Sequence, residues 1–216
     1  MPINHFYFNK VVFTFASMHY STHLSKDEKL KPLIDKQEIR QLKKEKNICL
    51  YLCYSIMSQQ LSTQVAKVFH ERFISLYGGK EPTARQIADT KFETLRSIGL
   101  SNAKANYVLN VAKFELENGM DAKHLNSLSN EEVITYLTQI KGVGKWTVEM
   151  LLMFALGRED IFSADDLGIQ NAMIRLYNLK PRNKKSLKKR MHQISKSWSP
   201  YRTYACLYLW GWKDGK

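Results

Sequence analysis

Residues 137–149 decide the fold of this chain and read Leu137-Thr-Gln-Ile-Lys-Gly-Val-Gly-Lys-Trp-Thr-Val-Glu149. Gly142 and Gly144 interrupt an amphipathic pattern that otherwise continues from about Asn130 to Leu156. Each glycine costs a helix about 1 kcal/mol and allows a backbone φ above zero. We therefore expect a helix, a tight hairpin, and a second helix that begins near Lys145.

This hairpin predicts a site for an anion. Backbone N–H groups ahead of the second helix point toward whatever lies before it, and the positive end of the helix dipole favours negative charge. The chain carries a net charge of +13. In so basic a protein, the expected anion is a DNA phosphate.

The distribution of charge also points to a polyanion. The 216 residues suit one large domain or two interleaved subdomains, with 44% apolar and 25% charged residues as in ordinary soluble proteins. No apolar run reaches the roughly 18 residues of a membrane span. Between Leu167 and Lys213 there are eleven basic residues and no Asp or Glu. A nucleic acid explains this segment better than membrane lipid or a simple solvated face.

Cysteine usage excludes several classes of site. Cys49, Cys53 and Cys206 are the only cysteines, too few for a disulfide framework or a four-cysteine metal site. The spacing of Cys49 and Cys53 is one helical turn, which favours two core-facing thiols. A reducing compartment is expected, and no secretion.

The pattern beyond residue 17 is helical almost throughout. Ser25-Lys-Asp-Glu28 is a capping-box pattern that predicts a helix beginning there. Residues 1–17 stay unassigned, as a disordered extension or a mis-assigned start with a short strand near 11–15, and residues 18–216 form the predicted domain. The other predicted helices are 47–58, 62–77, 83–90, 90–98, 101–118, 129–140, 145–156, 166–177, 186–197 and 201–210.

Further motifs, in order along residues 20–212, carry a resemblance to a known family. The chain resembles the HhH-GPD superfamily of DNA glycosylases, and within it 3-methyladenine DNA glycosylase II of the alkylation-repair branch. This likeness implies an all-α, two-lobed fold, with the Ser-Gln-Gln and hairpin regions on opposite walls of a cleft between the lobes. Besides the hairpin, the matching segments are His23–Asp27, Ile56–Ser62, Gly99–Ala105, Ile161–Gln170, Trp198–Ala205 and Leu209-Trp210.

Asp166 is the catalytic candidate. Asp165 and Asp166 precede an amphipathic helix, so the residues alone favour a helix N-cap. The resemblance implies instead that Asp166 is catalytic, with Asp165 as the alternative. A fixed carboxylate stabilises the oxocarbenium-like sugar formed when an N-glycosidic bond breaks. A base made cationic by alkylation leaves without a general acid, so one carboxylate suffices.

The residue at position 146 predicts the subtype. Relatives with additional lyase activity carry a Lys there, whose amine forms a Schiff base with the sugar. This chain has Trp146, with Lys145 about 100° away around a helix. The resemblance makes Trp146 and Trp210 aromatic walls of a base pocket, where cation–π contacts contribute about 0.5–2 kcal/mol each. Met150 and Leu167 occupy two pocket positions that are Tyr in the bacterial enzyme, and two core tryptophans remain the alternative to aromatic walls.

Gln60 matches the position that fills the gap left by an extruded base, with Leu61 as the neighbouring alternative. Extrusion costs a few kcal/mol, and a side chain entering the stack offsets part of it. A buried polar helix cap is the competing interpretation of Gln60.

The resemblance also assigns roles to the hairpin backbone. The amides of Gly142, Gly144 and Lys145 match phosphate contacts. The carbonyls that match a monovalent-cation site, for Na⁺ or K⁺, belong to Thr138, Ile140 and Val143.

The expected function is that of a monofunctional DNA glycosylase that hydrolyses the N-glycosidic bond of alkylated purines in base excision repair. The alternatives are a glycosylase for deaminated or oxidised bases and a non-catalytic hairpin DNA-binding protein. We expect no required cofactor, and no iron–sulfur cluster because only Cys206 lies near the C-terminus. The expected partner is damaged double-stranded DNA, bound by a monomer in the bacterial cytoplasm or nucleoid, or in a eukaryotic nucleus.

Overall fold

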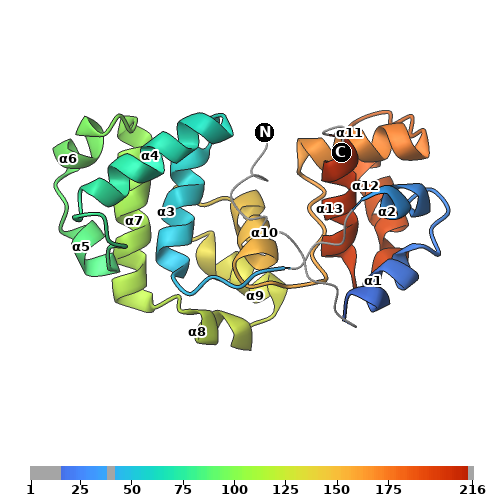
Figure 1. Ribbon diagram of the computed structural model, residues 1–216, viewed down its shortest axis with the longest axis horizontal. Coiled ribbons are helices and arrows are strands. Elements are labelled where there is room, and N and C mark those ends of the chain that lie inside the picture. Colours follow the sequence, from blue (N-terminus) through green and yellow to red (C-terminus); the bar gives the residue numbers. More distant parts are fainter. Residues whose placement is uncertain (1–15, 38–41, 214–216) are drawn as a thin grey trace. The chain divides into compact units, whose positions relative to one another are not determined.

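The computed structural model describes residues 16–37 and 42–213. Over those residues the regular elements are helices and no strand occurs, which confirms the all-α prediction (Figure 1). The described chain forms two compact units: unit 1 is 43–156, and unit 2 combines 16–37 and 42 with 157–213. The Ser-Gln-Gln and hairpin regions both lie in unit 1, so the prediction that they form opposite walls of a cleft between the lobes is wrong, because α3 (Ile48–Ser58) and α10 (Lys145–Phe154) belong to the same unit. A cleft between the lobes and the division at residue 17 stay predictions. Helix α1 begins at Ala16, and the strand predicted near 11–15 lies outside the described residues.

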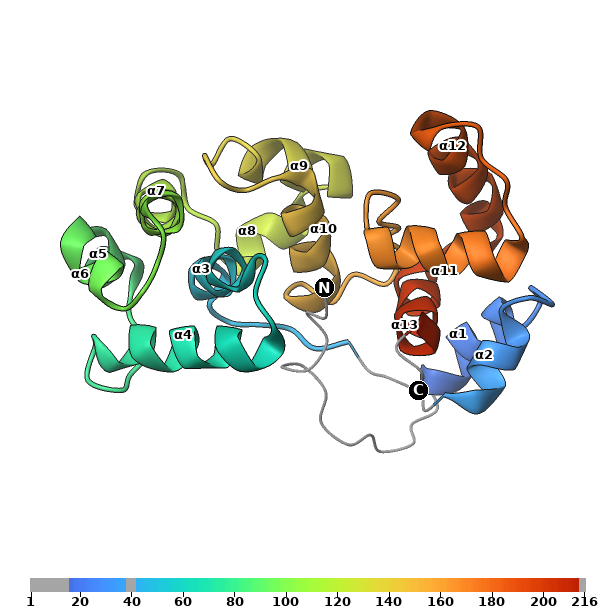
Figure 2. The same ribbon diagram turned by 90° about the horizontal axis from the view of Figure 1, so that it is seen from above.

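Unit 1 is built around two helices, α3 and α7, that lie side by side (Figure 1, Figure 2). Leu52 and Ile56 of α3 and Val108 of α7 are completely buried. Helix α4 packs on α3, α5 and α6 pack on α7, and α10 contacts both α3 and α9. The helices of unit 1 are α3 Ile48–Ser58, α4 Thr63–Ser75, α5 Ala84–Ala88, α6 Phe92–Ser97, α7 Asn102–Asn118, α8 Ala122–Ser127, α9 Asn130–Leu137 and α10 Lys145–Phe154.

Unit 2 centres on α13, against which α11 and α2 pack (Figure 2). A half-buried carboxylate joins distant segments: Oδ2 of Asp27 accepts hydrogen bonds from the Tyr177 hydroxyl at 2.7 Å and the Trp198 indole at 2.9 Å. The elements of unit 2 are α1 Ala16–Leu24, α2 Lys31–Lys36, α11 Leu167–Tyr177, α12 Lys184–Ser195, the 3₁₀ helix η1 Lys196–Trp198 and α13 Arg202–Lys213.

Local capping explains where the predicted helices begin. The Ser101 hydroxyl accepts the backbone N–H of Lys104 at the start of α7. Ser129 and Glu132 form a complete capping box at α9. The side chains of Asn47 and Ser62 likewise accept a backbone N–H in the first turns of α3 and α4. These side chains satisfy N–H groups that the first helical turn leaves unbonded.

The capping box predicted at Ser25 is wrong. Residues 25–30 form a turn, and α2 begins only at Lys31, with Pro32 in its first turn. The carboxylate of Asp27 accepts the amides of Lys29 and Leu30 within this turn. Tertiary hydrogen bonds hold the same carboxylate, so the local sequence does not start a helix here. The short helix α8, capped by Asp121, was not predicted. Among the described helices none is long and apolar enough to cross a membrane.

Candidate DNA-contacting surfaces and catalytic carboxylate

The predicted helix–hairpin–helix element is confirmed between α9 and α10. Gly142 has φ +106°, a conformation that residues with a side chain rarely adopt. The amide of Val143 donates to the Ile140 carbonyl at 2.9 Å and closes the turn. Both side chains are buried, so the hairpin has its own apolar anchor.

Helix α7 contacts the hairpin through two of its side chains. The ring of Tyr107 lies so close to Gly142 that a Cβ on this glycine would meet its Cγ at 2.2 Å. One turn further, Nδ2 of Asn110 donates to the Lys141 carbonyl at 3.2 Å. The glycine is therefore required twice, by its backbone angle and by the approach of the ring.

The backbone amides predicted to bind phosphate are available. Within the described chain, no hydrogen bond uses the amides of Gly142, Gly144 or Lys145. No side chain caps the start of α10 either. The ammonium of Lys145 lies 3.7 Å from the carboxylate of Glu149 on the next turn of its own helix. Free amides at a helix N-terminus suit an anion.

The hairpin carbonyls are compatible with a monovalent cation. Oxygen atoms are the ligands that hard cations take. The Ile140 carbonyl already accepts the Val143 amide, but a carbonyl oxygen has two lone pairs. The cation bound by the carbonyls of Thr138, Ile140 and Val143 stays a prediction.

The turn after α3 displays Gln60 in a strained conformation. Gln60 is exposed and has φ +62°, in the left-handed region. That conformation costs a residue with a Cβ about 1–2 kcal/mol. The amide of Leu61 donates to the Ser58 carbonyl at 3.1 Å, and Ser62 then caps α4. The alternative of a buried helix cap is wrong for Gln60, whereas its insertion into DNA stays a prediction.

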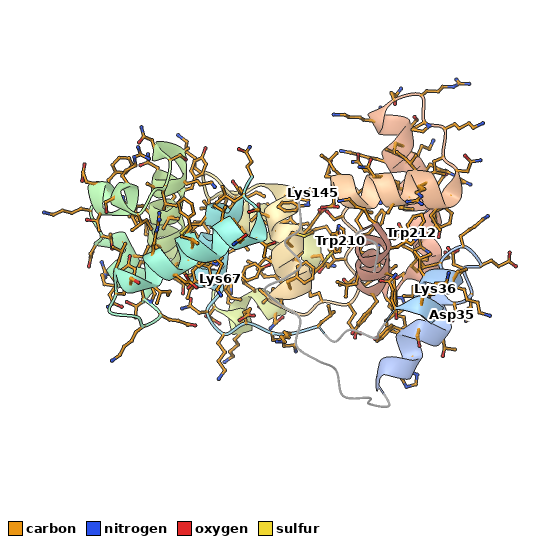
Figure 3. The ribbon with its side chains drawn as sticks, turned by 45° about the horizontal axis from the view of Figure 1, so that its top comes forward. Asp35, Lys36, Lys67, Lys145, Trp210 and Trp212 are labelled. Atoms are coloured by element: carbon orange, nitrogen blue, oxygen red, sulfur yellow. The ribbon has the colours of Figure 1, made fainter. Side chains whose placement is uncertain are left out.

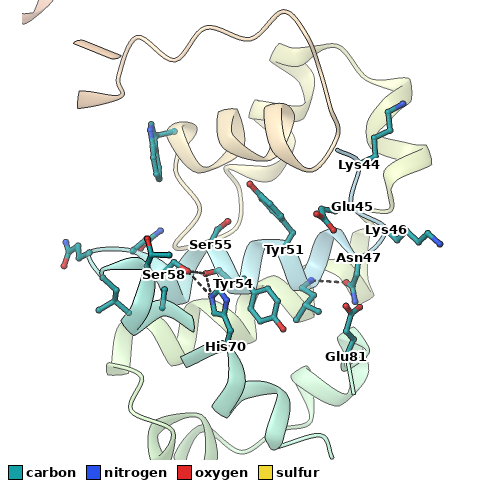
Figure 4. A pocket seen from close by; sticks show the side chains of 17 residues that line it. Lys44, Glu45, Lys46, Asn47, Tyr51, Tyr54, Ser55, Ser58, His70 and Glu81 are labelled. Atoms are coloured by element: carbon teal, nitrogen blue, oxygen red, sulfur yellow. Dashed lines mark hydrogen bonds between the residues drawn. The ribbon is translucent and has the colours of Figure 1, made fainter. Parts of the chain in front are cut away.

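A pocket of about 710 Å³ adjoins this turn within unit 1 (Figure 4). It brings together three predicted site residues: Gln60, Leu61 and Trp146. Tyr51 and Ser55, one turn apart on α3, point into it, and the Tyr51 hydroxyl donates to the Met150 carbonyl at 3.2 Å.

Met150 itself is 3% exposed and does not line the pocket. Its role as a base-pocket residue stays a prediction. Sequence reasoning missed Tyr51 and Ser55, because a tyrosine and a serine inside an apolar helix resemble ordinary core residues. Their spacing of four was the available signal.

Tyr54 and His70, which also line the pocket, form a neutral aromatic pair. The rings of Tyr54 and His70 stack with centroids 4.1 Å apart. Nε2 of His70 lies 3.0 Å from the Ser58 hydroxyl and 3.3 Å from the Tyr54 carbonyl. Burial lowers the pKa of His70 and, together with Glu81, raises the pKa of Tyr54 to about 12. Both rings are therefore uncharged near neutral pH.

In unit 2, Asp166 both caps a helix and accepts a second hydrogen bond. Its Oδ1 accepts the Ile169 amide at 2.8 Å at the start of α11. The same oxygen accepts the indole N–H of Trp210 at 2.8 Å. Trp210 belongs to helix α13 (Figure 3). The capping interpretation of Asp166 is confirmed. It leaves the carboxylate half-buried and held by two donors, a fixed arrangement compatible with the predicted catalytic role.

The neighbours of Asp166 differ in exposure. The side chain of Asp165 is exposed and forms an ion pair with Lys188 of α12. Leu167 is 69% exposed, the largest value among the exposed large apolar residues, whereas Trp210 is only 7% exposed. The roles of Leu167 and Trp210 in a base pocket stay predictions.

The loop that leads to Asp166 is tied to α13. The guanidinium of Arg202 donates to both carboxylate oxygens of Asp160, at 2.6 and 2.9 Å. Burial acts to raise the pKa of Asp160, but hydrogen bonds from Arg202 and Ser199 hold it below its ordinary value. Beyond it, Nε2 of Gln170 donates to the Ala164 carbonyl at 2.8 Å. A rigid loop keeps the carboxylate of Asp166 in place.

Gly168 provides the space for the pair of Asp166 and Trp210. A Cβ there would lie 3.0 Å from Oδ1 of Asp166 and 3.1 Å from Nε1 of Trp210. Asp166 is the predicted catalytic carboxylate, so we expect Gly168→Ala to lower the predicted rate of base excision about tenfold, because a displacement of a few tenths of an ångström is costly for a reacting group. Thermal stability should change little, since the crowding offsets the roughly 1 kcal/mol that Ala contributes to a helix. Excision kinetics and thermal melting, measured side by side, check this; equal activity of the two proteins would contradict it.

The acid-free segment lies in unit 2. Five of its basic residues lie in the first two turns of α12. A sixth, Arg175, lies 4.7 Å from the centroid of the Trp212 ring. The lysines and arginine of α12 are Lys184, Lys185, Lys188, Lys189 and Arg190, all exposed or half-exposed.

An all-helical scaffold built around such a hairpin and followed by a fixed aspartate defines a class of DNA-repair proteins. The chain belongs to the HhH-GPD superfamily of base excision DNA repair proteins, whose family model matches residues 53–200. The resemblance to its alkylation-repair branch is thereby confirmed, since the curated relatives include DNA-3-methyladenine glycosylases.

Three relatives illustrate the similarity. A putative DNA-3-methyladenine glycosylase of Bacillus subtilis is 34% identical over 168 residues, which are 75% of this chain and 57% of that protein. DNA-3-methyladenine glycosylase 1 of Schizosaccharomyces pombe is 40% identical over 161 residues, or 74% of this chain and 69% of that protein. The solved structure of Schizosaccharomyces pombe 3-methyladenine DNA glycosylase in complex with abasic DNA has 36% identity and a TM-score of 0.77, and covers 89% of this chain and 95% of its own. The chain thus spans little more than half of the Bacillus relative.

Proposed function

We propose that this chain is a monofunctional DNA glycosylase that removes alkylated purines, such as 3-methyladenine, from double-stranded DNA and leaves an abasic site. The carboxylate of Asp166, held by the amide of Ile169 and the indole of Trp210, is the observation that carries the proposal. The names of the relatives, DNA-3-methyladenine glycosylases, support the substrate class.

In the proposed reaction, Asp166 acts on the sugar. Cleavage of the N-glycosidic bond leaves positive charge on C1′ and the ring oxygen of the deoxyribose. An anion already fixed beside that sugar stabilises the transition state without reorganising. The carboxylate also orients the water that attacks C1′. Because an alkylated purine is cationic, it departs as a neutral base and needs no protonation.

Recognition of the base falls to electron-rich rings. We assign Trp146 to this role, with Tyr51 beside it on the wall of the same pocket. A cationic purine is attracted to such rings by about 0.5–2 kcal/mol each. The indole N–H of Trp210 is occupied by Asp166, so this tryptophan both orients the carboxylate and, in the proposal, offers its ring to the base.

The remaining parts act on the DNA itself. The free amides at the start of α10 bind phosphate, and a monovalent cation at the hairpin carbonyls would add positive charge beside it. Exposed Gln60, or its neighbour Leu61, enters the space of the extruded base. We propose that the protein works as a monomer, in the nucleoid of a bacterium or the nucleus of a eukaryote.

Two other functions compete with this one. A non-catalytic DNA-binding protein gains nothing from a carboxylate that faces DNA, because the carboxylate repels phosphate. A glycosylase for deaminated or oxidised bases acts on neutral bases, which do not gain the cation–π attraction.

The decisive experiment incubates the protein with methylated duplex DNA and identifies the released bases by mass spectrometry. Free 3-methyladenine supports the proposal. Release of hypoxanthine or 8-oxoguanine from matched duplexes, without 3-methyladenine, assigns the chain to the other glycosylase class. Tight DNA binding with no released base supports the binding protein.

The reaction product is predicted to be an intact strand with an abasic site. Lyase chemistry needs an amine that reaches the sugar. Position 146 carries an indole instead, and the neighbouring Lys145 ammonium pairs with Glu149 at 3.7 Å. We expect strand cleavage only after alkali or an abasic endonuclease is added. A covalent adduct at Lys145, trapped by borohydride, would contradict the monofunctional assignment.

A further inference from the structure

The turn that carries Gln60 receives support from a residue outside it, Lys104 of α7. Its ammonium donates to the Met57 carbonyl at 2.8 Å and to the Gln59 carbonyl at 2.7 Å. Met57 is the next-to-last residue of α3, and Gln59 is its C-cap residue, directly before Gln60. Both contacts are shorter than an ordinary N–H···O bond, as charge-assisted hydrogen bonds are.

The position of the ammonium is electrostatically favourable. The C-terminus of α3 carries the negative end of the helix dipole and carbonyls without helical partners. Lys104 is half-buried, and burial lowers its pKa. A partly dehydrated ammonium binds carbonyl oxygens more strongly than an exposed one.

We propose that Lys104 is a positioning residue for base extrusion: it holds the 59–61 turn so that exposed Gln60 stays in the left-handed conformation that directs its side chain toward DNA. The inference rests on the proposed function, because it assumes that Gln60 or Leu61 enters the duplex. Lys104 contacts neither the sugar nor the base in this proposal, so its effect passes entirely through the turn.

Packing of α3 against α7 does not depend on this lysine. Leu52, Ile56, Ala105 and Val108 are completely buried, and α3 and α7 pack against each other. The loss of the ammonium should therefore release the turn and leave the core intact. This separation makes a positioning role testable against a structural one.

Helix α7 also places the hairpin, which strengthens the argument. Lys104, Tyr107 and Asn110 follow at intervals of three and lie along one side of the helix. Lys104 contacts the 59–61 turn, and the other two contact the hairpin at Gly142 and Lys141. One rigid helix thus fixes both backbone segments that the proposed function assigns to DNA.

The test compares Lys104→Met with Lys113→Met, which changes an exposed lysine of the same helix. Single-turnover excision of an alkylated purine is measured in duplex DNA and in a single strand, where no base pair has to open. Lys104→Met should slow excision from the duplex about 10- to 100-fold, while excision from the single strand and the melting temperature stay close to the wild type. Fluorescence of 2-aminopurine next to the lesion should show reduced extrusion. Lys113→Met should match the wild type.

A double mutant tests whether the effect passes through Gln60. Glycine adopts φ +62° without strain, so in a Gln60→Gly background the change Lys104→Met should add little. Lys104→Arg, which keeps a cationic donor, should restore part of the duplex activity. Equal losses on duplex and single strand, additive effects in the double mutant, or a Lys104→Met protein as active as the wild type would each overturn the proposal. No excision by the wild type on either substrate would instead refute the proposed function.

Discussion

Asp166→Asn is expected to lower base excision by at least about 100-fold, since it removes the charge that we propose stabilises the oxocarbenium-like sugar. The fold should persist. Asn is as good an N-cap as Asp, and its carbonyl oxygen can still accept from the Ile169 amide and the Trp210 indole, both now at 2.8 Å. Affinity for DNA should hold or rise, because the variant removes one negative charge that would repel phosphate. Single-turnover excision, fluorescence anisotropy with duplex DNA and thermal melting measure the three quantities.

Asp165→Asn is the matched control for this prediction. Asp165 is adjacent in sequence, exposed, and pairs with Lys188 instead of accepting from Trp210. Exposed ion pairs contribute at most about 1 kcal/mol, so this variant should excise almost normally. An active Asp166→Asn protein beside an inactive Asp165→Asn protein would transfer the catalytic role. If both variants stayed active, the assignment as a carboxylate-dependent glycosylase would be wrong.

The sequence predicted local structure well where caps and glycines govern it. Ser101, Ser129 and Asn47 begin their helices as expected, and the hairpin at Gly142 was predicted from two glycines alone. The prediction failed at Ser25, where Asp27 accepts hydrogen bonds from Tyr177 and Trp198, 150 and 171 residues away in the chain. A local pattern contains no information about such partners.

In the candidate site too, local features could be predicted from the sequence, whereas contacts between distant residues could not. Asp166 was identified because its motif and its helix are local in sequence. Its hydrogen bond to Trp210 spans 44 residues, and the contact of Lys104 with Gln59 spans 45. Tyr51 and Ser55 acquire meaning only through the pocket that they line. The family resemblance thus indicated the candidate catalytic group, whereas the groups that orient it required the folded chain.

Gly142→Ala is expected to disable the hairpin. A Cβ at this position would lie 2.2 Å from Cγ of Tyr107 and 2.6 Å from both Cδ atoms, and φ is +106°. Crowding of a packed ring costs about 1–3 kcal/mol, and the backbone conformation costs a further 1–3 kcal/mol, roughly. The hairpin should therefore shift away from α7 and carry its free amides out of register with phosphate. We expect DNA affinity to fall at least about tenfold and the melting temperature to fall by several degrees.

Gly144→Ala is the control: it tests whether the loss of a hairpin glycine by itself, without the clash and the backbone strain at Gly142, lowers DNA affinity. Gly144 has φ −96°, which every residue adopts, and no atom lies within 4 Å of its Cβ position. As a change of N-cap from Gly to Ala, it should cost less than about 1 kcal/mol and leave DNA binding nearly intact. Tyr107→Ala combined with Gly142→Ala removes the clash but keeps the backbone strain, so it should restore affinity only in part. In this proposal the free amides at the start of α10 bind phosphate. Equal DNA affinities of the Gly142→Ala and Gly144→Ala proteins would contradict that role for the hairpin.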